Sequence, residues 1–158
     1  MRCLVVYFSW SGVTAKVARY LAETLQADLE EIKCNEYKNL FWAIWYGLFL
    51  KKKNLTLQPQ KFDPGSYDLV IIGAPTWAGR PPLPVKVYLD LYQSRLPKVA
   101  FFSTAANPRE QKVLSTLENW SGKKPVATAH FHRFAVQTAQ FPQLLAGFVR
   151  QFRTSTAD

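Results

Sequence analysis

Three short continuous runs of apolar residues punctuate the chain, and they are rich in β-branched and aromatic side chains. Such runs are typical of strands that are buried on both faces of a sheet. They occupy residues 3–8, 69–73 and 99–103. A more polar run at residues 27–34 predicts an edge strand, and residues 126–132 predict a fifth strand.

Between these runs, apolar residues recur at a spacing of three to four, which is typical of helices with one buried face. In residues 13–26, Val17 and Leu21 share one face while Lys16 lies off it. Further helices are predicted at residues 83–92, 109–120 and 142–152.

Strands that alternate with helices predict an α/β protein with a mainly parallel sheet and helices on both faces. Five strands in 158 residues fit a single domain, residues 1–158, with a doubly wound five-stranded parallel sheet in the order 2-1-3-4-5. In such sheets ligands bind beyond the carboxyl ends of the strands. The loops after the first, third and fourth strands are therefore the places to look for chemistry.

The loop after the first strand combines hydroxyl side chains with a glycine at the start of a helix. Free backbone N–H groups and the positive end of a helix dipole favour a phosphate group at such a position. The alternative is an ordinary helix cap made by Ser11 or Thr14. The residues of this loop are Ser9, Trp10, Ser11, Gly12, Val13 and Thr14.

The other two loops suit a planar ring with polar edges. A tryptophan between small residues and prolines, just past a buried strand, can stack on such a ring. In the last of the three loops, small residues leave room for a ligand edge that backbone N–H groups or the Asn107 amide would reach. The residues concerned are Pro75, Thr76, Trp77, Ala78 and Gly79 after the third strand, and Thr104, Ala105, Ala106 and Asn107 after the fourth.

Together the three loops resemble the flavodoxin-like family. The pattern Ser9-x-Ser11-Gly12-x-Thr14 looks like the FMN phosphate loop of flavodoxins, [ST]-x-[ST]-G-x-[ST]. Residues 67–81 (YDLVIIGAPTWAGRP) are similar to the flavin-stacking segment of the family, and residues 98–104 resemble its fourth strand. The resemblance covers essentially the whole chain and implies a flavodoxin-like fold with FMN as cofactor. The chain departs from the family at Ala105-Ala106, where many relatives are richer in glycine.

Carried over residue by residue, the resemblance implies a role for each loop. The residues 9–14 would bind the FMN phosphate through three hydroxyls and the backbone. Pro75, Thr76 and Trp77 would flank the isoalloxazine ring, and residues 104–107 would line its pyrimidine side. The flavin would carry the electrons, so no catalytic side chain is expected.

The chain has 20 Lys and Arg against 11 Asp and Glu, a net charge of +9. Residues 1–36 hold four basic and five acidic residues, so the excess lies entirely in the remainder. Such a balance first suggests nucleic acid, an anionic membrane or an acidic partner. The basic residues are scattered and no nucleic-acid motif accompanies them, so we expect no nucleic-acid binding.

Three function classes remain open at this point. The first is electron transfer through bound FMN with a redox partner protein, which the basic surface predicts to be acidic. The second is an NAD(P)H-dependent reductase of a quinone or another small acceptor, in which Arg80 and Arg109 would attract nicotinamide phosphates. The third is a flavodoxin fold without flavin that acts as an interaction module, for which Ala105-Ala106 is the argument.

Several minor features complete the expectations. Cys3 and Cys34 are predicted to be free thiols, because they fall at opposite ends of neighbouring strands. His130 and His132 share one face of the last strand, but two ligands rarely hold a metal, so no metal site is expected. Without a visible signal peptide the expected location is cytoplasmic.

The segment Leu40–Lys53 is an apolar run with no polar face, followed by three lysines. It is predicted to pack on the sheet, to form a dimer or partner surface, or to contact a membrane peripherally.

Overall fold

In the computed structural model of the chain, residues 1–37, 55–107 and 112–154 are described. Five strands form one sheet in the order β2-β1-β3-β4-β5, and every neighbouring pair is parallel. This confirms the predicted doubly wound sheet. The strands are β1 (Cys3–Tyr7), β2 (Asp28–Glu31), β3 (Leu69–Pro75), β4 (Lys98–Ala105) and β5 (Ala127–His132).

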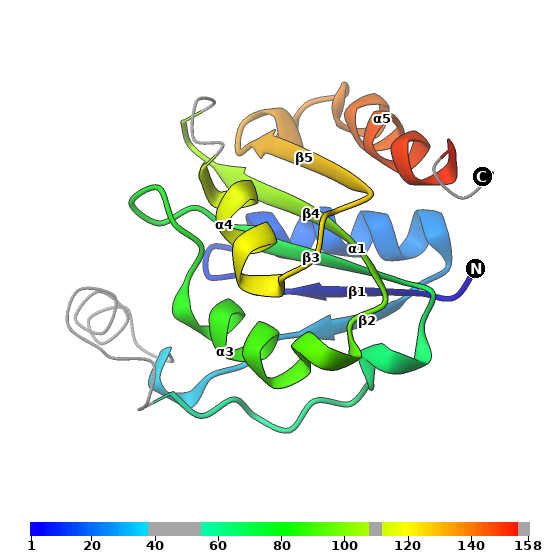
Figure 1. The fold of residues 1–158 in the computed structure, drawn as a ribbon. Coiled ribbons are helices and arrows are strands. Elements are labelled where there is room, and N and C mark those ends of the chain that lie inside the picture. The colour runs from blue at the N-terminus through cyan, green and yellow to red at the C-terminus, as the bar shows by residue number, and fades with distance from the viewer. Residues whose placement is uncertain (38–54, 108–111, 155–158) are drawn as a thin grey trace.

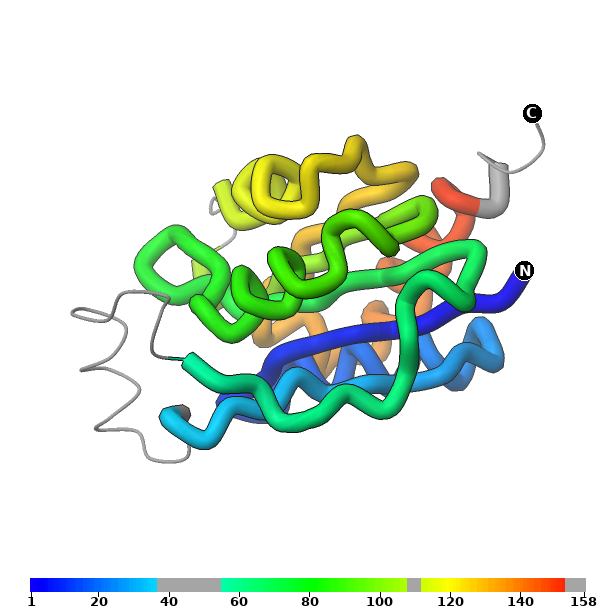
Figure 2. The backbone as a smooth tube through the Cα atoms, turned by 60° about the horizontal axis from the view of Figure 1, so that its bottom comes forward, coloured from blue at the N-terminus to red at the C-terminus, as the bar shows by residue number. Residues whose placement is uncertain are grey.

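Helices cover both faces of the sheet (Figure 1). The helices are α1 (Val13–Leu25), α3 (Leu83–Tyr92), α4 (Lys112–Ser121) and α5 (Phe141–Thr154). One apolar core lies between the sheet and α1 with α5, where Leu21 and Phe148 are almost completely buried. The other lies between the sheet and α3 with α4, around Tyr88 and Leu117. The tube in Figure 2 shows α3 and α4 side by side on one layer.

Two central strands are longer than the apolar runs predict. The β3–β4 ladder continues through Ala74 opposite Ser103 and Pro75 opposite Thr104. The extension places the beginnings of the second and third loops in hydrogen-bonding register. Gly73 in β3 and Ser103 in β4 interrupt the apolar runs, and the strands continue beyond them.

The edge strand β2 is shorter than predicted, because the chain beyond it pairs with a different segment. Residues 55–62 run along its outer side: the Gln58 N–H donates to the Lys33 carbonyl at 2.9 Å. The Glu30 carboxylate accepts the N–H groups of Lys61 and Phe62 at 3.0 and 2.9 Å. The polar side chains of this strand therefore hold the segment that covers its edge.

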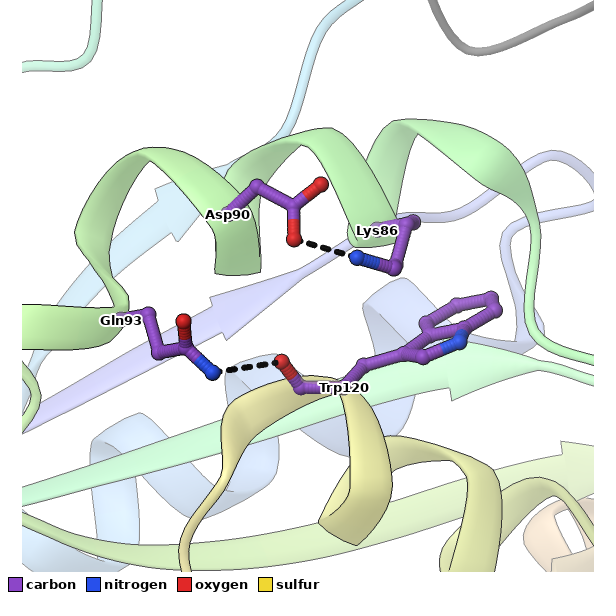
Figure 3. A network of polar contacts seen from close by, with 4 residues as sticks. All are labelled: Lys86, Asp90, Gln93 and Trp120. Atoms are coloured by element: carbon purple, nitrogen blue, oxygen red, sulfur yellow. Dashed lines mark hydrogen bonds and ion pairs between the residues drawn. The ribbon is translucent and has the colours of Figure 1, made fainter.

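Contacts between α3 and α4 are partly polar (Figure 3). Lys86 and Asp90 form an ion pair one turn apart on α3, and the Lys86 ammonium lies 5.9 Å from the centre of the Trp120 ring. The Gln93 side-chain amide donates to the Trp120 carbonyl at 3.5 Å. These contacts fix α4 relative to α3, beside the strands that carry the second and third loops.

Both cysteines are buried thiols outside any disulfide, and the Cys34 thiol donates to the Glu36 carboxylate at 2.8 Å. Within the described ranges, no helix combines the length and apolar character needed to cross a bilayer. The predicted contact segment Leu40–Lys53 lies outside the described residues. Arg109, which was expected to attract nicotinamide phosphates, also lies outside them.

Candidate functional site

Three loops gather at the carboxyl edge of the sheet, to which the arrowheads in Figure 1 point. We call residues 9–14 the first loop, residues 75–80 the second and residues 104–107 the third. They follow β1, β3 and β4, which are consecutive neighbours in the sheet. The structure therefore brings all three predicted segments to one edge.

The first loop ends in the N-terminus of α1, where Gly12 is the cap residue with φ +85°. The cap interaction is not made by Ser11 or Thr14: the Ser9 hydroxyl oxygen accepts the Ala15 N–H at 3.2 Å. The first helical hydrogen bond runs from the Lys16 N–H to the Gly12 carbonyl at 2.9 Å. Of the three residues between Gly12 and Lys16, Ala15 donates to Ser9, and the N–H groups at positions 13 and 14 have no carbonyl partner within the helix. Ser11 is exposed beside them.

Thr14 occupies a different position from the other hydroxyl residues of the first loop. It is 1% exposed, and its hydroxyl lies 2.8 Å from that of Thr104, which is 4% exposed. The carbonyl of Thr104 accepts the Thr76 N–H at 2.8 Å. These two hydrogen bonds join the three loops to one another through Thr104.

The second loop folds as a tight turn that presents Trp77. Its N–H donates to the Arg80 carbonyl at 2.9 Å, and the Arg80 N–H returns to the Trp77 carbonyl at 3.0 Å. The two residues between are both left-handed, with φ +48° at Ala78 and +78° at Gly79. Positive φ at both central positions defines a type I′ turn. For Ala78 this conformation is strained by roughly 1 kcal/mol.

An aromatic cluster supports the turn. The Trp77 ring meets Phe8 edge-to-face with centroids 5.7 Å apart, and it meets Trp10 in the same manner at 6.3 Å. Trp10 and Trp77 are half-buried, whereas Phe8 is buried. The two partly exposed indoles thus link the first and second loops at the edge of the sheet.

The third loop is attached to β5 by two histidines. His132 Nε2 lies 2.5 Å from the Ala106 carbonyl oxygen, and His130 Nε2 lies 3.2 Å from that of Asn107. Ala105 and Ala106 stand where many relatives are richer in glycine. Ala105 is buried and Ala106 is exposed, so only one of these two methyl groups lies at the surface. Neither histidine is among the residues that the sequence predicts to bind the cofactor. Their i, i+2 spacing on a strand predicted next to the fourth was the available signal.

The charge around the first loop is small. Its six residues include no ionisable side chain, so a phosphate would be held there by N–H and hydroxyl groups. A cavity of about 380 Å³ is lined by Ser9 and Trp10 on one side and by Glu31 and Lys33 beside β2. Burial raises the pKa of the neighbouring Tyr7 phenol, the Glu31 carboxylate raises it further, and Arg19 opposes both. That phenol therefore remains protonated at neutral pH.

Residues 1–37, 55–107 and 112–154 contain no group of three His, Cys, Asp or Glu side chains arranged to hold a metal ion. A Ser–His pair does occur: the Ser103 hydroxyl lies 2.7 Å from His130 Nδ1. Ser103 is completely buried, so its hydroxyl is closed to any substrate. The pair is part of the internal hydrogen bonding of the third loop.

Comparison with known proteins agrees with this geometry. A flavodoxin family model matches residues 2–43, the part that includes β1, the first loop and α1. No curated protein matches the chain.

Solved structures match over most of the chain. A flavoprotein from Lactobacillus acidophilus NCFM in complex with FMN is 27% identical and superposes with a TM-score of 0.70, over 82% of this chain and 92% of that one. Oxidised Flavodoxin 2 from Bacillus cereus is 18% identical, with a TM-score of 0.64 over 98% and 99% of the two chains. An NADH:FMN oxidoreductase in its apo form is 18% identical, with a TM-score of 0.65 over 98% and 90%. The last two share the fold. The family match over residues 2–43, the sheet order and the superposed structures show that this chain has the flavodoxin-like fold.

Proposed function

We propose that the chain binds FMN at the three loops and transfers electrons through it. The observation that carries the proposal is their junction at Thr104, which hydrogen-bonds to Thr14 of the first loop and Thr76 of the second. A phosphate site, a stacking side chain and a backbone edge for the ring thereby lie in one constellation. The FMN complex of the 27% identical flavoprotein supports the same ligand here.

The residues present fit this cofactor. Among the described residues, the Thr76 hydroxyl oxygen is one of the few buried side-chain atoms without a hydrogen-bond partner. An unpaired buried hydroxyl costs roughly 1–3 kcal/mol, which a polar atom of a bound ring would offset. The first loop offers the Ser11 hydroxyl, the Ser9 hydroxyl hydrogen and two helix N–H groups to a phosphate. The half-buried Trp77 offers a surface for ring stacking.

Each loop would do a distinct task. The first loop would hold the phosphate with neutral donors, because it has no lysine or arginine of its own. The tight turn of the second would fix Trp77 against the ring and exclude water from one side. The third would present its backbone to the polar edge of the ring. When bound, FMN supplies the electron-carrying chemistry.

The direct test is the colour and flavin content of the purified chain. We expect a yellow preparation that releases FMN on heating, identified by chromatography, and an apoprotein that quenches FMN fluorescence on titration. Ser11→Ala should weaken FMN without weakening riboflavin, which lacks the phosphate. A colourless chain that leaves the fluorescence of added FMN unchanged would refute the proposal.

A second candidate is an NAD(P)H-dependent reductase of a quinone or another small acceptor. The observation that favours it is Arg80, an exposed cation that closes the turn of Trp77 and so lies beside the proposed ring site. NADPH oxidation by the holoprotein with a benzoquinone, in the absence of any other reductase, would establish this activity. Arg80→Glu should then raise the KM for NADPH, whereas exposed Arg133→Glu serves as a charge-matched control. If NADPH is not oxidised under these conditions, the reductase activity is refuted and electron transfer to a partner protein is the function that stands.

For the carrier function we propose an acidic partner protein. All of the net positive charge resides in residues 37–158, which contain the second and third loops. Complementary charge raises association rates and makes them fall with ionic strength. Stopped-flow reduction of the holoprotein by an acidic ferredoxin-type donor should slow as salt is raised. A rate that increases with salt would contradict an acidic partner.

A further inference from the structure

We propose that His130 and His132 are positioning residues that orient the backbone of the third loop for the polar edge of the flavin ring. The inference rests on the proposed FMN site and adds two residues to it. Neither histidine belongs to the three loops: both come from β5, on the far side of β4.

Three successive carbonyls of the third loop are engaged by β5 and the residue after it. The Ala105 carbonyl accepts the Arg133 N–H at 2.8 Å, which continues the ladder. The Ala106 and Asn107 carbonyls lie 2.5 and 3.2 Å from the Nε2 atoms of His132 and His130. Because a carbonyl oxygen only accepts, both Nε2 atoms must carry a hydrogen.

The tautomer of His130 is therefore determined by its surroundings. With its hydrogen on Nε2, the neutral ring accepts at Nδ1, where the Ser103 hydroxyl lies 2.7 Å away and donates. Ser103 is completely buried, so this hydrogen bond does not compete with water. A buried hydroxyl thus fixes the ring that in turn fixes the Asn107 carbonyl.

Two of these hydrogen bonds, from Arg133 and His132, determine where the loop N–H groups point, and that of His130 holds the Asn107 carbonyl beside them. In a trans peptide the C=O and N–H point in opposite directions, and the described residues contain no cis bond. The N–H of Ala106 is therefore directed away from Arg133, and the N–H of Asn107 away from His132. The next residue is Pro108, which has no N–H to offer.

Two neighbouring N–H groups turned away from β5 form a donor pair for an acceptor oxygen or nitrogen of a planar ring. Without the histidines, the Ala106 and Asn107 carbonyls would lose these hydrogen bonds, and a loop of small residues with two exposed members would lose this preference. A ring would then have to order the loop on binding, which lowers affinity.

The test compares variants at position 132 that differ only in donor reach. His132→Ala removes the donor, His132→Asn keeps an amide that is too short, and His132→Gln keeps an amide that reaches the position of Nε2. Dissociation constants for FMN are measured by quenching of flavin fluorescence, and unfolding by urea is followed in parallel. Thr128→Ala, on the same face of β5, is the matched control.

We expect His132→Ala and His132→Asn to raise the Kd for FMN about fivefold, the equivalent of one neutral hydrogen bond. His132→Gln should restore it to within about twofold, and His130→Ala with His132→Ala should raise it by more than tenfold. Exchange of the Ala106 and Asn107 amides in the ligand-free chain, followed by NMR, should accelerate in the alanine variants and be slowed again by glutamine.

Two results overturn the inference separately from the proposed function. If the wild type binds FMN and the alanine variants bind it equally well, the histidines do not position the loop. The same holds if glutamine and alanine weaken FMN equally, because the effect is then one of packing. If the wild type binds no FMN at all, the proposed function itself fails.

Discussion

The first and third loops lie at the same edge of the sheet but are held in opposite ways. Apart from the Thr14–Thr104 hydroxyl pair, the hydrogen bonds that shape the first loop join residues close in the chain, Ser9 to Ala15 and Gly12 to Lys16. Those that shape the third loop reach residues 23 and 26 positions away on β5, and 90 positions away at Thr14. A local loop keeps its shape wherever its helix forms, whereas the third loop has a shape only when β4, β5 and α1 are in place.

The difference separates what each loop contributes to a ligand. The first loop is a helix N-terminus, so its donors come from residues that are adjacent in the chain. The third depends on tertiary structure, so its orientation can change without any substitution within it. The second loop resembles the first, because its turn closes through hydrogen bonds between Trp77 and Arg80.

The largest effect is expected where the base of the second and third loops is disturbed. A Cβ added at Gly73 would lie 2.0 Å from the ring of Phe102, which is completely buried in β4. Gly73→Ala should lower the free energy of unfolding by about 3 kcal/mol, because the ring must move within a packed core. Urea denaturation followed by circular dichroism measures the loss.

Gly147→Ala provides the control for that substitution. A Cβ at Gly147 of α5 meets no atom within 4 Å, and alanine raises helix propensity, so stability should rise by about 0.5–1 kcal/mol. Equal effects of Gly73→Ala and Gly147→Ala on stability would show that the Phe102 ring does not need the space left by the absent side chain of Gly73.

The next effect concerns the link between the first and third loops. Thr14→Val leaves the buried Thr104 hydroxyl without its partner, and Thr104→Val does the reverse. Each should lower the free energy of unfolding by about 2 kcal/mol. The double variant should lose about 1 kcal/mol less than the two single losses together, because both partners are then gone. Additive losses in this double-mutant cycle would mean that the hydroxyls are not coupled.

The same contrast explains how far the sequence predicts this molecule. The apolar runs of β1, β3 and β4 are buried on both faces, so a two-sided apolar pattern was sufficient to recognise them. The first-loop motif is local and was recognisable for the same reason.

What the sequence did not predict depends on pairing across the sheet. The last pair of the β3–β4 ladder is Pro75 with Thr104, and this pairing needs the register of two strands. The roles of His130 and His132 need the position of β5 beside β4, and so does the burial of Ser103. Thr14 is predicted by its motif as a phosphate ligand, and only the fold shows its hydroxyl against that of Thr104.

Within the first loop, two serines should separate folding from phosphate binding. Ser9 accepts the Ala15 N–H, so Ser9→Ala should lower the free energy of unfolding by about 1 kcal/mol. Ser11 is exposed and its loss should change stability by less than about 0.5 kcal/mol. Thermal denaturation distinguishes them, and FMN titration should show weaker binding for both. A larger stability loss for Ser11→Ala would contradict the capping role of Ser9.

The smallest effect tests whether the second loop is local like the first. Ala78 has φ +48° at the first central position of a type I′ turn, where asparagine followed by glycine is strongly preferred. Ala78→Asn should therefore raise the free energy of unfolding by about 0.5–1 kcal/mol, through relief of the left-handed strain. The same change at exposed Ala146 in α5 should lower it by about 0.5 kcal/mol, because asparagine is a poorer helix former than alanine. The opposite signs, measured by urea denaturation of the two variants, would show that backbone conformation decides the outcome. If Ala78→Asn is destabilising as well, the turn is held by its surroundings, and the second loop belongs with the third.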